Sequence, residues 1–276
     1  MKIRGSIVAV LALLAGACST GTESVPRENY GIVFAETQAV ESGYVLNPTA
    51  SFFSSPQLSF NTSVQSADLC VVTEFDPDAE DLLPNLRFLS AGEALTATLS
   101  GETRTLNRVV APNETETYEV QTGGGIVFEP GDTLQLSAPG ADGGFPEFTI
   151  KARTAEEFTF TEPTPPAAGE GLVLTWTPRI TNGSTMLVSL RYALTGSAPD
   201  TQIYCDLVDD GSFTIPAAQI IGWRDATVRE NVFTRWRTEV KQLNDNSYVV
   251  VSSTLSVPTP GSGPTFARSL RQIGRW

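Results

Sequence analysis

The chain contains 276 residues, of which 18 are basic and 31 are acidic, and its formal net charge at pH 7 is −13. A surface this acidic repels phosphate backbones, which argues against nucleic acid as a partner. The sequence contains no histidine, which excludes histidine acid–base catalysis, the Ser-His-Asp triad and the common zinc and copper sites. No two carboxylates stand out as a catalytic pair, so we expect a protein that is not an enzyme and has no cofactor.

The first residues have the pattern of a cleaved signal peptide, over residues 1–17. Lys2 and Arg4 form a positively charged start, and an apolar run from Ile7 to Leu14 follows. A run of about 10 apolar residues is too short to cross a hydrocarbon core, which requires about 20 residues. This length and these flanks are typical of the apolar region of a signal peptide, so we expect export from the cytoplasm.

The segment Leu-Ala-Gly-Ala-Cys, which ends at Cys18, resembles the lipobox of bacterial lipoproteins, although Ala15 stands where the usual pattern has leucine. The resemblance implies that Cys18 is lipidated, for example with palmitate, and that residues 18–28 form the lipidated cysteine and a tether. Several acyl chains on one cysteine hold a protein stably on a membrane. By resemblance to enteric lipoproteins, Ser19 after the cysteine implies the outer rather than the inner membrane, so we expect a cell-envelope protein facing the periplasm or the surface. The alternative is an ordinary secretory peptide in which Cys18 is incidental.

Residues 29–160 are expected to form an N-terminal β domain. Helical periodicity is almost absent, while short β-branched and aromatic runs alternate with Gly, Pro, Asn and Asp. This is the pattern of short strands joined by turns. The predicted strands cover 30–35, 43–46, 58–60, 69–75, 87–89, 94–99, 104–109, 117–120, 125–129, 133–137 and 147–152.

Two cysteines remain beside Cys18, namely Cys70 and Cys205. Outside the cytoplasm such a pair is a candidate disulfide, which would tie the two halves of the body together. Both cysteines also lie in strand-like runs, where two separate buried thiols would fit equally well. The sequence leaves both alternatives open.

A dense group of carboxylates lies in one predicted loop, at Asp76, Asp78, Glu80 and Asp81. Alternating carboxylates can bind Ca²⁺ outside cells, so this loop is a candidate calcium site. The loop is not an EF-hand, because its sixth and twelfth positions hold Asp81 and Arg87 in place of glycine and glutamate. The alternative is a solvated turn on an acidic protein.

A proline-rich linker over residues 161–170 is expected to separate the first domain from a second β domain over residues 171–257. Three prolines within four residues keep this linker extended. Asp209, Asp210 and Gly211 are expected to form a hairpin turn between two strands of the second domain. The predicted strands of this domain include 184–193, 202–208, 212–215, 231–243 and 247–255.

The segment Leu-Thr-Trp-Thr-Pro, which ends at Pro178, is similar to the second strand of fibronectin type III and related immunoglobulin-like domains. This resemblance implies an immunoglobulin-like sandwich with Trp176 in its core. Residues 130–255 also resemble uncharacterised exported bacterial lipoproteins, whose last domain has a Trp-Thr-Pro strand, then Cys and Asp-Asp-Gly-Ser-Phe-Thr-Ile-Pro. That likeness implies no particular activity. The predicted fold is all-β, with two β-sandwich-like domains after a cleaved lipoprotein signal peptide.

The chain ends in a tail over residues 258–276. Four aromatic residues in the last part of the chain are candidates for stacking on a sugar ring, namely Trp223, Trp236, Tyr248 and Trp276. We expect a non-enzymatic adhesion, scaffold or assembly module whose partners are the membrane, through the lipid anchor, and another envelope protein. The alternative is a module that binds a glycan or a cell-wall polymer. A scaffold should show an exposed strand edge or apolar patch, and a glycan module should show a coplanar aromatic strip.

Overall fold

The computed structural model describes residues 27–40, 43–55, 68–75, 86–112, 115–120 and 124–258. The predicted leader with Cys18, the strand at 58–60, the acidic loop at 76–81 and the tail that contains Trp276 lie outside these residues. The regular secondary structure of the described residues consists of strands and one short helix, which confirms the predicted all-β class.

The strands of the first half are β1 (Glu28–Val40), β2 (Gly43–Ser55), β3 (Leu69–Glu74), β4 (Arg87–Phe88), β5 (Ala94–Leu99), β6 (Glu102–Val110), β7 (Glu116–Glu119), β8 (Ile126–Phe128), β9 (Thr133–Ala138) and β10 (Phe148–Arg153). The second half contains β11 (Leu172–Thr175), β12 (Ser184–Ala193), β13 (Thr201–Val208), β14 (Ser212–Ile215), the helix α1 (Ile221–Asp225), β15 (Val228–Asn244) and β16 (Ser247–Pro258).

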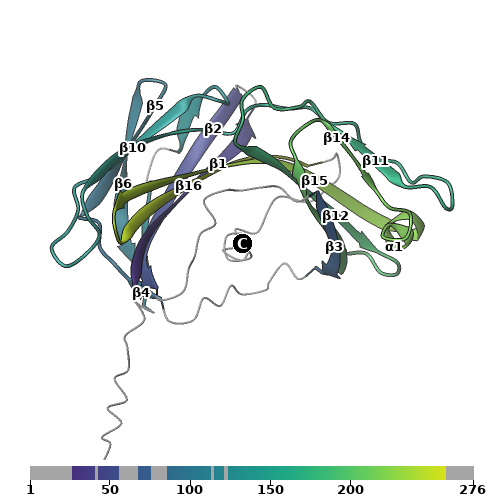
Figure 1. Cartoon of the computed structure of the whole chain (residues 1–276), viewed down its shortest axis with the longest axis horizontal. Coiled ribbons are helices and arrows are strands. Elements are labelled where there is room, and N and C mark those ends of the chain that lie inside the picture. The colour runs from purple at the N-terminus through teal and green to yellow at the C-terminus, as the bar shows by residue number, and fades with distance from the viewer. Residues whose placement is uncertain are drawn as a thin grey trace, which may run out of the picture.

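One 14-stranded sheet contains strands of both halves, in the order β10-β9-β5-β6-β7-β2-β1-β16-β15-β12-β13-β3, and β4 and β8 pair with β2. The first strand, β1, pairs with β2 in antiparallel and with the last strand, β16, in parallel orientation. Figure 1 shows the sheet bent into an arch, with β3 and β4 at its two feet. The boundary predicted at residues 161–170 is therefore not a boundary of this sheet.

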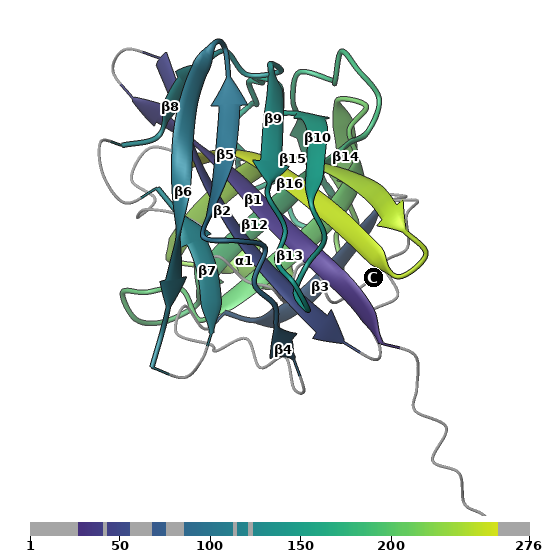
Figure 2. The ribbon, with the colours of Figure 1, turned by 90° about the vertical axis from the view of Figure 1, so that its left-hand side faces the viewer.

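The arch has an outer layer on each side. Figure 2 shows β5, β6, β9 and β10 standing across β1, β2 and β16. On the other side, the two-stranded sheet of β11 and β14 and the helix α1 lie outside β12 and β15 (Figure 1). The first outer layer is the end of the same sheet that crosses over its centre, whereas β11 and β14 form a separate sheet, and each layer encloses its own hydrophobic core. Phe52 and Tyr118 belong to the first core, and Trp176 and Phe233 belong to the second.

Successive side chains of a strand point to opposite faces of a sheet, and this alternation separates a third cluster from the two cores. On β1, Val33 belongs to the first core, while Tyr30 and Ile32 belong to the third cluster. Leu187 on β12 and Trp236 on β15 complete it on the inner face of the arch, together with Phe53. The sheet is thus apolar on both faces along its centre.

The hairpin predicted around Asp209, Asp210 and Gly211 is wrong. The strand before it, β13, pairs with β12 and β3, whereas the strand after it, β14, pairs with β11 of the outer layer. Where the chain leaves the arch, the Asp209 side chain is buried and accepts a hydrogen bond of 2.9 Å from the indole Nε1 of Trp176. The last hairpin, by contrast, is formed by β15 and β16 as predicted.

Candidate functional site

A disulfide between Cys70 and Cys205 joins β3 to β13 at one end of the sheet, so the first of the two alternatives for these cysteines holds. The two residues lie opposite each other in an antiparallel pair, with their Cα atoms 4.0 Å apart. This bond holds the short strand β3 covalently at the edge of the arch, far in sequence from its neighbour.

The backbone of β3 presents hydrogen-bonding groups to the outside of the sheet. A Cα separation near 4.5 Å marks a non-hydrogen-bonded antiparallel pair, in which the N–H and C=O groups point away from the partner strand. Cys70 is such a residue, and because the pattern alternates, Val72 and Glu74 also direct these groups outward. The residues in the alternate positions should direct these groups toward β13 instead. Phe75 does so, since its N–H donates to the carbonyl of Asp200 at 2.8 Å. Among the described strands, none pairs with this outer side of β3.

The exposed edge of β3 is also apolar. Leu69, Val71 and Val72 are 56%, 38% and 51% exposed. Leu69 and Val71 lie on the inner face of the arch, and Val72 lies on the outer face, because side chains alternate along a strand. Strand edges of this kind bind other strands unless charges, proline or a covering segment protect them.

The opposite end of the sheet, β10, carries such protection. Its exposed side chains include Lys151 and Arg153. The N–H of Arg153 points away from β9 and donates to the carboxylate of Glu239 on β15 at 3.0 Å. The two edges of one sheet therefore differ. One is charged and capped, while the other is apolar and pairs with no further strand in the described part of the chain, and we call it the open edge.

Asp206 lies one strand inside the open edge, on β13. It pairs with Leu69 on one side and with Leu187 on the other. The residue is 8% exposed, and neither carboxylate oxygen has a hydrogen-bond partner in the described part of the chain. Burial, together with the charge of Asp68, raises the pKa of Asp206 from its ordinary value to about 7. Asp68 itself accepts the N–H of Val208 at 2.8 Å.

The sequence analysis did not predict Asp206 as a site residue, although the sequence around it contains one indication of its unusual environment. Asp206 interrupts an otherwise apolar run, Cys-Asp-Leu-Val, in a predicted strand. An acid at such a position must be paired, protonated or exposed.

The described candidate aromatics do not form one platform. Trp223 is fully buried in the second core, and its Nε1 donates to Asn231 at 3.2 Å. Trp236 is buried on the inner face of the arch, where its Nε1 donates to Ser252. Tyr248 packs against the same inner cluster and stacks on Tyr30 with a centroid distance of 5.9 Å. The two tryptophans thus lie on opposite faces of the sheet.

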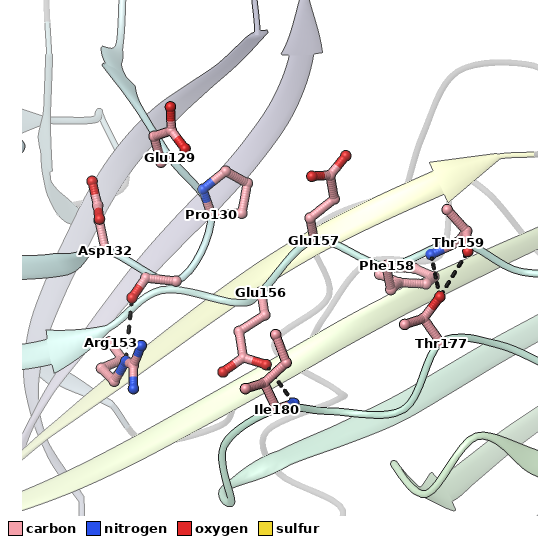
Figure 3. A pocket seen from close by; sticks show the side chains of 11 residues that line it. Glu129, Pro130, Asp132, Arg153, Glu156, Glu157, Phe158, Thr159, Thr177 and Ile180 are labelled. Atoms are coloured by element: carbon pink, nitrogen blue, oxygen red, sulfur yellow. Dashed lines mark hydrogen bonds between the residues drawn. The ribbon is translucent and has the colours of Figure 1, made fainter.

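A groove of about 680 Å³ lies on the outer side, where the two outer layers approach each other (Figure 3). Several carboxylates line it, and Figure 3 shows that the Glu156 side chain turns toward Ile180, whose N–H donates to it at 2.8 Å. Burial opposes ionisation, but the hydrogen bonds from Thr181 and Ile180 outweigh it and lower the pKa of Glu156. Arg153 donates from Nε to the carbonyl of Gly131 at 3.2 Å. These groups hold the groove in shape.

Among the described residues, no group of three or more His, Cys, Asp or Glu side chains could hold a metal ion. In the same ranges, no helix has both the length and the apolar character needed to span a membrane. No protein-family model matches this chain, and no curated protein matches it.

Proposed function

We propose that this protein is a lipid-anchored, extracytoplasmic assembly module that acts without catalysis and binds another envelope protein by strand addition at the open edge of β3. The observation that carries the proposal is the edge itself, which combines outward backbone groups at Cys70, Val72 and Glu74 with three exposed apolar side chains.

The proposed anchor rests on the sequence. The signal-peptide pattern and the lipobox-like segment end at Cys18, and only a short tether separates that cysteine from β1. We also propose that the body consists of two β-sandwich-like units. The two separate cores support this proposal, since each lies between the common sheet and its own outer layer. Outer-membrane sorting is part of the same proposal, on the basis of Ser19.

Strand addition requires an edge that keeps its shape when a partner binds. In this mode main-chain hydrogen bonds supply affinity, and the alternating side chains supply specificity. The disulfide between Cys70 and Cys205 supports such a role because it keeps β3 on β13 when a second strand pairs with its other side. The apolar side chains add contact area on both faces, where cross-strand pairs contribute roughly 0.2–1 kcal/mol each.

A peptide-binding measurement on the full chain tests this proposal. The probe is a short, extended peptide of alternating valine and lysine, followed by fluorescence anisotropy. The variant Val72→Pro removes an outward N–H and leaves the hydrogen bonds between β3 and β13 in place. We expect it to weaken binding at least tenfold, which corresponds to about 1.4 kcal/mol.

The matched control is Lys151→Pro on the opposite edge strand. Arg153, two residues later, directs its N–H away from β9, so Lys151 does the same. This variant should bind the peptide as the unchanged chain does. If Val72→Pro unfolds the protein, Val72→Lys replaces it, with Val173→Lys as the control at another exposed valine. Equal binding by the edge variant and its control would refute strand addition at β3.

A further inference from the structure

The Asp206 carboxyl group is buried beside the open edge of the sheet, and no described residue forms a hydrogen bond with it. A buried carboxylate without a hydrogen bond is costly, and natural proteins rarely leave one unpaired. Its neighbours on the inner face, Leu69 and Leu187, carry no donor group. Asp206 therefore costs stability in the free protein without a compensating contact from these two neighbours.

The charged groups described near Asp206 do not neutralise it. Asp68, which precedes β3, has the same charge and raises its pKa further. The nearest basic residue on the same face of β12 is Arg191, four positions beyond Leu187 and thus about 13 Å along the strand. The Arg191 guanidinium lies over the ring of Phe75, 4.3 Å from its centroid. Asp206 and Asp68 therefore make this end of the sheet acidic.

A binding partner at the edge of the sheet can reach Asp206 only across the edge strand β3. On the inner face, Leu69 is the β3 residue directly between Asp206 and the open edge, and its side chain is 56% exposed. A strand added to β3 would lie about 10 Å from β13, at two strand spacings. Lysine and arginine carry their charge on a long apolar stem, which can lie over a leucine while the charged end reaches further.

Resting on the proposed function, we propose that the strand which joins β3 carries a lysine or arginine opposite Leu69, and that the cationic end of this side chain pairs with the Asp206 carboxylate. Glu74 at the other end of β3, and the net charge of −13, favour the same basic partner. Pairing would supply the buried carboxyl with the hydrogen bonds that the described residues do not give it, which makes Asp206 a specificity-determining residue for a basic, apolar strand.

The test compares two peptides on the full chain, the valine–lysine peptide and the same peptide with glutamine in place of lysine. The variant is Asp206→Asn, and the matched control is Glu147→Gln, which removes one negative charge from an exposed position elsewhere. We expect Asp206→Asn to weaken binding of the lysine peptide about tenfold or more and to leave the glutamine peptide unchanged. The control should alter neither.

Proton release gives a second readout that a purely structural role would not change. With a pKa of about 7, Asp206 carries its proton in about half of the free molecules at neutral pH, and a bound cation would favour the ionised form. Binding of the lysine peptide should therefore release a proton in calorimetry with buffers of different ionisation enthalpy, and Asp206→Asn should abolish this release. If both peptides bind equally to the unchanged chain and to Asp206→Asn, the inference is wrong while strand addition stands. If neither peptide binds the unchanged chain, strand addition fails and the inference fails with it.

Discussion

The carboxylate of Asp209 and the guanidinium of Arg235 meet in the interior, with Oδ2 and Nε 2.7 Å apart and neither side chain exposed. The Arg235 Nη2 group donates to Oδ1 at 2.9 Å, and the hydroxyl of Ser184 donates to Oδ2 at 2.7 Å. This network connects β15, β12 and the point where the chain leaves the sheet after β13. It fixes the outer layer of β11 and β14 to the arch.

Removal of the Asp209 carboxylate should destabilise the protein strongly. Asp209→Ala leaves the Arg235 charge buried without its partner, which costs about 3–5 kcal/mol. The control is Asp210→Ala at the exposed neighbouring position, where we expect a change within about 0.5 kcal/mol. Urea denaturation measures both. A loss of less than about 1 kcal/mol for Asp209→Ala would contradict the structural role of the pair.

Loss of the disulfide should lower the stability of the whole fold. The bond closes a loop of 135 residues, for which chain entropy gives up to about 5 kcal/mol. The double variant with Cys70→Ala and Cys205→Ala should therefore unfold at a lower denaturant concentration. It should also lose hydrogen-exchange protection first at the amides that pair β3 with β13. Reduction of the unchanged chain should reproduce the effect, and equal protection in both forms would show that β3 does not depend on the bond.

Asp206 should make stability depend on pH. Its folded-state pKa of about 7 lies above the ordinary value of 3.8, so the folded protein binds this proton more tightly than the unfolded chain. The contribution is fully present below the ordinary pKa and is lost as the pH rises toward 7. As the pH rises from about 4 to 7, the unchanged chain should lose this contribution and Asp206→Asn should not. The unfolding free energy of Asp206→Asn, relative to that of the unchanged chain, should therefore increase by about 1–4 kcal/mol over this range. Parallel curves for the two proteins would show that Asp206 ionises normally.

Gly31 on β1 lies directly against Phe52 of the first core. A Cβ atom at this position would lie 2.5 Å from the ring of Phe52, so Gly31→Ala should cost about 1–3 kcal/mol through overpacking. Adding Phe52→Leu should recover part of that loss if the clash is with this ring. The double-mutant cycle measures the coupling between the two positions. If the changes in unfolding free energy are strictly additive, the loss in Gly31→Ala does not come from a clash with Phe52.

The sequence by itself determined the class of the fold and much of its local structure. Alternating apolar residues predicted nearly every described strand, and the turn at Asn244 to Asn246 predicted the pairing of β15 with β16. Trp176 lies in the second core, where the resemblance to immunoglobulin-like strands placed it. These features depend on residues close together in the chain, whose periodicity reports secondary structure directly.

Only the tertiary structure decided which distant strands meet. β1 lies between β2 and β16, β14 pairs with β11, and β3 forms the open edge beside β13. Asp206 and Asp209 show the consequence most clearly. Both are acids near the end of one strand, but Asp209 is paired with Arg235, while Asp206 is buried with no hydrogen-bond partner in the described ranges. Local pattern cannot distinguish them, because the charge and burial of each depend on strands far away in the sequence.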